Sequence, residues 1–328
     1  MASLRETKDR IGSVRSTLKI TSAMKLVASA KLRKAQKAIE GMRPYERTLA
    51  EILATVGPVR SAAASDGSAA NYFSYSSSKN QFAASHATPT HAAAETSIPP
   101  THAAVPSSTG LVGESPVGNT AIVAIASNSS LCGAFNANVI RKALEAIRAC
   151  EGEVEVYPVG RKMVEALRRA GYDAPADYNE LVAHPAYELS TALARSLAER
   201  YRAGELSRVV LVYNRFLSAS RQEPVVEHYL PFEQSSFAGL TGESPAEDYI
   251  IEPDAEALVA TLLPQVMMLK FHAAILDSAA AEHAARTIAM QTASDNAEDL
   301  LGELTLEYNK GRQQKITAEI LDLLGGAQ

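Results

Sequence analysis

The feature that most constrains the fold is a period of seven residues near the N-terminus. No glycine or proline interrupts the chain between Gly12 and Gly41. Apolar residues recur at every seventh position except one, where a lysine stands, and the companion series is mostly small: Leu4, Ile11, Leu18, Lys25, Leu32 and Ile39, with Thr7, Val14, Thr21, Ala28, Ala35 and Met42. Small companions let a partner helix approach closely, so the pattern predicts one helix of a coiled coil.

A second long helical pattern ends the chain. Small and apolar residues fall three or four positions apart along one stripe: Ala281, Ala285, Ala289, Ala293, Ala297, Leu300, Leu304, Tyr308 and Gly311. The stripe predicts a helix from about Asp254 to Leu324, roughly 100 Å long, that is kinked or restarted near Pro264. Such a helix is too long for one globular core, and we expect it to need a partner.

The charges of the two end segments are opposite. Residues 1–47 hold 12 Lys or Arg against 4 Asp or Glu, and residues 281–328 hold 4 basic and 8 acidic residues. The two ends therefore attract each other. Together with the small-residue seams, this predicts that the terminal helices pair as an antiparallel coiled coil.

The middle of the chain follows a different pattern. Stretches rich in β-branched residues predict strands, and periodic stretches between them predict helices: strands at 120–127, 154–160, 208–216 and 223–232, and helices near 136–149, 161–171 and 186–203. Alternation of strand and helix predicts an α/β domain with a mostly parallel, doubly wound sheet. We assign this domain to residues 120–235, between the helical segments 1–60 and 254–328.

Two segments fit neither pattern. In residues 61–119, 30 of 59 residues are Ala, Ser or Thr, and only four are charged. Such a composition buries too little apolar area to offset the ordering of the chain, so it predicts a flexible insertion. The run rich in glycine and acidic residues at 237–248 predicts a linker, which we place at 236–253.

The middle segment lacks the phosphate-binding motifs of a nucleotide-dependent enzyme. After the strand at 120–127 the chain reads SNSSLCGAFNANV, with neither GxGxxG nor GxxxxGK[ST] to hold phosphate. His86, His91 and His102 lie in the low-complexity insertion, which has no cysteine and too few carboxylates to complete a metal shell. Cys132 has no histidine near it in sequence, and a small packing residue is the simpler reading. We expect no catalytic residues, no metal and no cofactor.

The cysteine content and the apolar segments indicate in which cellular compartment the protein works. Two cysteines, Cys132 and Cys150, cannot form a disulfide framework, and no early apolar stretch resembles a signal peptide, which predicts a reducing compartment. No window approaches 18 consecutive apolar residues, so a role at a membrane would be carried by partners.

Three segments of the sequence resemble one family. The start MASLRETKDRIGSVRSTLKITSAMKLVASAKLRKAQ and the end AARTIAMQTASDNAEDLLGELTLEYNKGRQQKITAEILDLLGG are similar, nearly residue for residue, to the two ends of F-type ATP synthase gamma subunits. The segment SLCGAFNANV resembles the family's SDRGLCGGFN, although Asn128 and Ser130 stand where the family usually has Asp and Gly. The insertion lacks the cysteine pair of plastid members, and the start of the chain resembles a bacterial member.

The resemblance implies a fold and a role. The fold would be a long antiparallel coiled coil of the N- and C-terminal helices plus a central Rossmann-like α/β domain without a nucleotide site. The role would be that of a non-catalytic rotor shaft, which couples proton-driven rotation of the membrane c-ring to conformational cycling of the catalytic beta subunits. The implied partners are three alpha and three beta subunits, an epsilon subunit and the c-ring. The implied location is the cytoplasmic face of the bacterial inner membrane.

The resemblance also implies contact residues. Positions that touch the catalytic subunits or affect coupling in the family match Met24, Lys25, Arg286, Gln313, Thr317 and Glu319. Spacing alone favours plainer readings, with Met24 as core filler and Lys315 with Glu319 as an ordinary surface ion pair. The residue patterns alone are compatible with two other functions. One is an α/β-domain enzyme whose helices form a dimerisation stalk, and the other is a coiled-coil scaffold or basic nucleic-acid binder.

Overall fold

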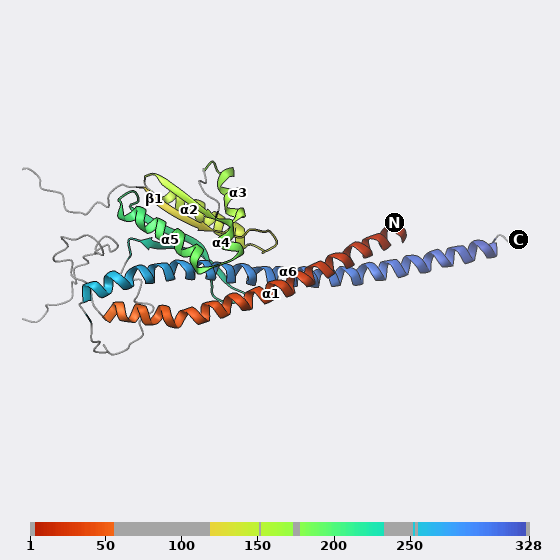
Figure 1. Ribbon diagram of the computed structural model, residues 1–328. Helices are drawn as coiled ribbons and strands as arrows, with labels where there is room; N and C mark the ends of the chain where they lie inside the picture. Colours follow the sequence, from red (N-terminus) through yellow and green to blue (C-terminus); the bar gives the residue numbers. More distant parts are fainter. Residues whose placement is uncertain are drawn as a thin grey trace, which may run out of the picture.

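The molecule is a long two-helix rod with a small α/β domain packed against one end (Figure 1). The computed structural model describes residues 4–55, 119–150, 152–172, 178–232, 252 and 255–325. The rod consists of α1 (Leu4–Thr55) and α6 (Ala255–Gly325). Apart from Asn119 and Glu252, the insertion expected at 61–119 and the linker expected at 236–253 lie outside the described residues.

Burial along α1 follows the period of seven that the sequence contains. Every position of both series is buried or half-buried, with Ala28, Leu32 and Ile39 no more than 9% exposed. Thr7 and Thr21 are buried as well, at 4% and 8% exposure. Residues outside the two series are mostly exposed, so one narrow face of α1 contacts its neighbour.

The two long helices run antiparallel. Leu4 lies against Gly311, where a Cβ would approach the leucine Cδ2 to 3.2 Å. Farther along the rod, the Ser294 hydroxyl donates a hydrogen bond to Thr21 Oγ1 at 2.8 Å. The opposite ends meet inside the α/β domain, where Leu53 of α1 and Leu263 of α6 share one hydrophobic cluster. The mixed α/β fold and the long C-terminal helix are thus as expected from the sequence.

The stripe expected on α6 is displaced by one residue in its middle part. Met290 and Ser294 are 4% exposed, whereas Ala289 and Ala293 are only half-buried. Leu300 is 40% exposed, whereas its neighbour Leu301 is half-buried. The helix also continues through Pro264 as one element. Pro264 is the tenth residue of α6, beyond the first turn that proline favours, and the packing of Leu263 and Val266 in the α/β core holds the helix at this point.

The sheet has four strands in the order β2-β1-β3-β4. The strands are β1 (Thr120–Ile125), β2 (Val154–Val159), β3 (Arg208–Phe216) and β4 (Gln222–Leu230). Strand β1 pairs in parallel with both β2 and β3, and β3 pairs antiparallel with β4. All six residues of β1 are buried, as expected for a central strand covered on both faces.

Helices cover both faces of the sheet. They are α2 (Phe135–Ala149), α3 (Arg161–Arg169), α4 (Asn179–Ala183) and α5 (Tyr187–Arg202). Helices α2 and α3 pack on the face that carries Ile122 and Val210, while α5 and the first part of α6 pack on the face that carries Val123 and Leu211. The short α4 has no periodic signal in the sequence and was not expected.

The first part of α6 belongs to the core of the α/β domain. Leu263, Val266 and Phe271 are at most 3% exposed and pack with strand residues. Helix α6 contains an 18-residue window whose mean hydropathy of 1.5 meets the length and composition of a membrane span, and half of that window is buried in the molecule. Such burial is typical of the core helix of a globular domain.

Candidate functional site

The crevice that holds a ligand in many parallel α/β sheets lies beyond the carboxyl ends of the strands, where the strand order reverses. Here it lies at the loop between β1 and α2. A Cβ added to Gly160, which has φ +99°, would overlap the carbonyl oxygen of Ala126. The turns after β1 and β2 therefore touch each other, and glycine is needed at 160 for both the close approach and the backbone conformation.

Asn128 ties these turns together. Its Oδ1 accepts a hydrogen bond from the backbone N–H of Arg161 at 2.9 Å, at the start of α3. Its Nδ2 donates to the carbonyl oxygen of Asn179 at 2.8 Å, at the start of α4. An aspartate could accept the first bond and could not donate the second. The departure from the family's usual Asp thus has a definite structural role.

The rest of the β1–α2 loop is filled by its own side chains. Asn136 accepts a hydrogen bond from the backbone N–H of Ser127 at 3.1 Å and donates to the Ser127 hydroxyl at 2.8 Å. Asn136 Nδ2 also lies 3.1 Å from Cys132 Sγ, and Cys132 is 1% exposed. The thiol is a packing group, since a reactive thiolate needs access and a nearby cation. Within the described ranges, no cluster of His, Cys, Asp or Glu has the arrangement of a metal site.

Met24 and Lys25 lie in the middle of the rod, where both are half-buried. Lys25 occupies a seam position, and its ammonium donates to Gln291 Oε1 of α6 at 2.7 Å. Gln291 in turn donates to Asp295 Oδ1 at 2.6 Å. Lys25 is thus the one polar residue in the mainly apolar series that begins at Leu4, and its hydrogen bond to Gln291 connects α1 to α6.

Arg286 lies closer to the α/β domain and is only 9% exposed. Its Nη1 pairs with Glu282 Oε1 at 2.7 Å, and its Nη2 donates to Ser129 Oγ at 2.9 Å. Burial raises the pKa of Glu282, while the guanidinium of Arg286 opposes that rise. This side chain, which the family resemblance assigns to contact with the catalytic subunits or to coupling, thus binds other residues of its own chain.

Gln313, Thr317 and Glu319 form a separate group on the part of α6 beyond Gly311. All three are exposed, and Figure 1 shows that α6 continues here past the end of α1. The Thr317 hydroxyl donates to the carbonyl oxygen of Gln313 at 2.9 Å. Glu319 pairs with Lys315 at 3.7 Å, with both side chains more than 60% exposed. The structure therefore divides the six expected residues into a mid-rod group (Met24, Lys25 and Arg286) and a tip group (Gln313, Thr317 and Glu319).

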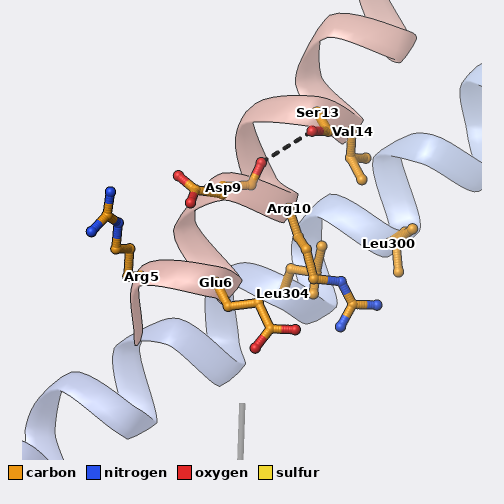
Figure 2. A pocket seen from close by; sticks show the side chains of 8 residues that line it. All are labelled: Arg5, Glu6, Asp9, Arg10, Ser13, Val14, Leu300 and Leu304. Atoms are coloured by element: carbon orange, nitrogen blue, oxygen red, sulfur yellow. Dashed lines mark hydrogen bonds between the residues drawn. The ribbon is translucent and has the colours of Figure 1, made fainter. Parts of the chain in front are cut away.

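The tip also exposes large apolar side chains. Between 46% and 77% of each is accessible: Ile316, Ile320, Leu321, Leu323 and Leu324. A shallow groove lies beside the first turns of α1, with Leu300 and Leu304 of α6 on one side (Figure 2). In this view Glu6 and Arg10 extend toward α6, while Arg5 points away from it. The groove has a charged rim and does not enclose a small molecule.

Sequence reasoning missed three residues that bind the mid-rod group: Gln291, Glu282 and Ser129. Glu282 stands four residues before Arg286, so the ion pair was visible as an i,i+4 spacing. Ser129 is 157 positions away from Arg286, and no local pattern could have connected them.

Comparison with known proteins gives a consistent result over the whole chain. The family model described as ATP synthase matches residues 3–328. The ATP synthase gamma chain of Bacteroides fragilis is 43% identical over 332 residues, which cover 100% of this chain and 99% of that relative. The ATP synthase gamma chain of Flavobacterium johnsoniae is 35% identical over 331 residues, with the same coverage.

Solved structures agree at the level of the fold. The rotor of the Euglena gracilis mitochondrial ATP synthase in rotational state 1 has a TM-score of 0.55 at 16% identity, covering 95% of this chain and 98% of that chain. A chain of the OSCP/F1/c-ring assembly of the same enzyme in rotational state 3 matches with a TM-score of 0.57 at 19% identity. The match covers 99% of this chain and 93% of that chain.

Proposed function

Because the chain belongs to the ATP synthase gamma chain family, we propose that it is the central rotor shaft of an F-type ATP synthase. In this role it couples rotation of a proton-driven membrane ring to conformational cycling of the catalytic beta subunits. The observation that carries the proposal is the rod itself. Two antiparallel helices leave the α/β domain and end in a single helix whose apolar side chains are exposed (Figure 1).

The rod acts as an antiparallel coiled coil, and the α/β domain is a Rossmann-like body without a nucleotide site. The seam of period seven on α1 supports the first assignment, because its residues are the ones buried against α6. A pair of closely packed helices resists twisting better than one helix, which a shaft requires. The filled crevice beyond β1 and β2 supports the second assignment.

Rotation changes the catalytic subunits through differential contact. One asymmetric rod faces three chemically equivalent beta subunits, so each angle of the rod favours a different conformation of each beta subunit. A contact can shift such an equilibrium only by the difference in its free energy between the two conformations. Nucleotide affinity in the beta subunits therefore cycles as the rod turns, and this chain supplies no catalytic group.

The angle-dependent contacts are made by the two groups of residues on the rod. Met24 and Lys25 act in the middle, and Gln313, Thr317 and Glu319 act at the tip. The exposure of the tip group on unpaired helix supports this assignment. Arg286 influences coupling from its buried position beside Glu282.

The partners are three alpha and three beta subunits around the rod, with an epsilon subunit and the c-ring at the α/β domain. The complex lies on the cytoplasmic face of the bacterial inner membrane, and this chain reaches the membrane through those partners. The rival α/β-domain enzyme loses support because the crevice that would hold its ligand is occupied by Asn136, Cys132 and the turn at Gly160.

Co-expression with alpha and beta subunits tests the proposal. We expect a stoichiometric complex whose ATP hydrolysis drives proton pumping in membrane vesicles once the remaining subunits are present. The same vesicles without this chain should not pump. A chain that stays alone in the presence of all other subunits would refute the rotor role.

A further inference from the structure

The α/β domain touches the rod through the loop between β1 and α2. Cys132 and Phe135 of this segment pack with Ala281 of α6 in one buried cluster, against which Ala285 also packs. A Cβ added to Gly133 would lie 3.9 Å from Ala289 Cβ. The loop therefore lies along α6 from residue 281 to residue 289, at the point where the rod leaves the domain (Figure 1).

The Glu282–Arg286 ion pair lies within this contact. The two side chains are 8% and 11% exposed, and the N–O distance is 2.7 Å. The other i,i+4 pair at the far end of α6, Lys315–Glu319, is 3.7 Å apart and 66% and 63% exposed. Exposed pairs of that kind contribute little, whereas a buried pair is retained at a desolvation cost and fixes its surroundings only if its remaining hydrogen bonds are satisfied.

Ser129 supplies such a hydrogen bond from the domain side. Arg286 Nη2 donates to Ser129 Oγ at 2.9 Å. The serine belongs to a loop that is itself held, because Asn136 Nδ2 donates to the Ser129 carbonyl oxygen at 3.3 Å and the Ser127 hydroxyl donates to the same oxygen at 2.5 Å. A force on Arg286 is therefore transmitted to the start of α2 and the end of β1.

We propose that Glu282 and Arg286 are positioning residues that fix the angle of the rod relative to the α/β domain by holding the β1–α2 loop through Ser129. The proposal rests on the rotor role, because a fixed angle matters to a shaft that receives torque at the domain and delivers it at the rod. Arg286 then affects coupling through this chain's own loop. A direct ionic contact with a catalytic subunit is the opposing explanation.

A mutant cycle separates the two explanations. The pair is neutralised by Glu282→Gln with Arg286→Gln, which leaves no charge buried alone. Ser129→Ala removes the domain side of the contact, and the triple variant removes both sides. Ser130→Ala is the control at the neighbouring serine, which is exposed like Ser129. Proton pumping per ATP hydrolysed is measured for each variant in vesicles that contain the assembled complex.

If the loop is the target, Ser129→Ala lowers pumping per ATP about twofold and the neutralised pair lowers it about threefold, as losses of one or two hydrogen bonds permit. The triple variant then equals the neutralised pair, because residues that act as one unit are not additive. Ser130→Ala stays at the wild-type value. If Ser129→Ala behaves like Ser130→Ala, or if the losses multiply in the triple variant, the proposal is overturned.

A second measurement on the full chain does not depend on the rotor role. Nitroxide labels at Arg141→Cys on α2 and Thr292→Cys on α6, with Cys150→Ser, report the distance between domain and rod. We expect a narrow distribution of label-to-label distances in the otherwise unchanged chain. The distribution should broaden in the neutralised pair and in Ser129→Ala, and it should stay narrow in Ser130→Ala. An unchanged width in the neutralised pair refutes the positioning role even where pumping falls. If the wild-type complex does not pump but the labels respond as expected, the rotor role fails while the positioning role stands.

Discussion

Asp277 illustrates how the fold acts on a single carboxyl group. The residue lies on α6 beside α1 and the β3–β4 hairpin, and burial raises its pKa to about 6. The guanidinium groups of Arg43 and Arg215 oppose this rise, and the carboxylates of Glu46 and Glu227 add to it. The ionised form of Asp277 is therefore disfavoured in the folded chain.

Replacement of Asp277 by asparagine is expected to stabilise the chain at pH 7.5 by about 1–3 kcal/mol, since one pKa unit corresponds to about 1.4 kcal/mol. The folded pKa of about 6 exceeds the unfolded value of 3.8, so the penalty is fully present above pH 6 and disappears as pH falls through 3.8. Urea unfolding at pH 7.5 and at about pH 4 measures the difference from wild type. Asp299→Asn on the exposed face is the control, and an equal gain at both pH values would contradict the assignment.

Arg200 joins two elements of the α/β domain. From α5 its guanidinium pairs with Glu155 of β2 and with Glu205, both at 2.8 Å, and it also donates to the Tyr157 hydroxyl. Hydrogen bonding from Arg200 is the main cause that lowers the pKa of Glu155. The Arg200 and Glu155 side chains are each 31% exposed, so solvent weakens the pair.

We expect Arg200→Ala to lower the free energy of unfolding by about 1 kcal/mol, the scale of a partly exposed ion pair with one further hydrogen bond. The loss should be smaller in 1 M salt, because screening already weakens the pair in wild type. Urea unfolding with and without salt measures both effects. Arg195→Ala, on the exposed side of the same helix, should change neither value, and a loss at Arg200 that is independent of salt would point to packing alone.

At the scale of single residues, the sequence indicates which side chains make polar contacts, but it does not identify the residues of the same chain that they bind. The spacing of Glu282 and Arg286 was visible, and so was the polar break at Lys25. The partners Ser129 and Gln291 could not be identified, because they depend on how the domain sits on the rod and on the register of the two long helices.

In the two long helices, the periodicity of the sequence identifies the buried face of α1 but not that of α6. On α1 one face is buried, so the period of seven coincides with burial at every position. Between Ala281 and Arg286, α6 is buried on several faces, by α1 and by the β1–α2 loop. Alanine is common on all of these faces, and the sequence therefore could not locate the seam to better than one residue.

Register is the property of the helix pair that a cross-link can test. Thr21 Oγ1 and Ser294 Oγ are 2.8 Å apart and buried, so cysteines at both positions lie within reach of a disulfide. We expect Thr21→Cys with Ser294→Cys to form an intramolecular cross-link on mild oxidation, visible as faster migration on a non-reducing gel.

The control for this cross-link is Ala35→Cys with Ala297→Cys. Ala35 packs in the same cluster as Ala280, which places Ala297 about 25 Å farther along the rod at 1.5 Å per residue. This pair should not cross-link within one chain. Equal cross-linking of both pairs, or formation of dimers only, would contradict the antiparallel register.

On the scale of the whole molecule, the order of the parts along the chain could be predicted from the sequence, whereas the packing of α6 into the α/β domain could not. A division between residues 235 and 254 is natural from the pattern, yet Leu263, Val266 and Phe271 of α6 pack in the core of the α/β domain. Periodicity describes one helix and does not reveal that its first part covers a sheet. The tip shows the converse, since its apolar residues continue the helical pattern but stay exposed among the residues that the structure describes.

The tip supports a prediction that distinguishes an isolated helix from a shaft with partners. Gln313→Ala with Thr317→Ala should leave the free chain at least as helical, because alanine is the better helix former and the hydrogen bond of the Thr317 hydroxyl goes to the backbone of its own helix. In the assembled complex we expect rotation-coupled ATP turnover to fall about fivefold or more, because two hydrogen bonds of roughly 0.5–1.5 kcal/mol each are lost.

Circular dichroism of the free chain and proton pumping by the complex measure the two parts of this prediction. Asp322→Ala is the control, since this exposed residue lies on the opposite side of the same helix from Gln313 and Thr317. Unchanged pumping in a normally assembled double variant would show that this face makes no angle-dependent contact.

The entry of α6 into the core of the α/β domain has a consequence for biosynthesis. The ribosome makes α1 first and α6 last, so α1 must wait without its partner while more than 190 residues are added between Thr55 and Ala255. During that time its apolar seam is open to other proteins, and the sheet lacks the helix that covers one of its faces. Neither the rod nor the domain can complete its folding during synthesis, and both do so together once the final segment emerges.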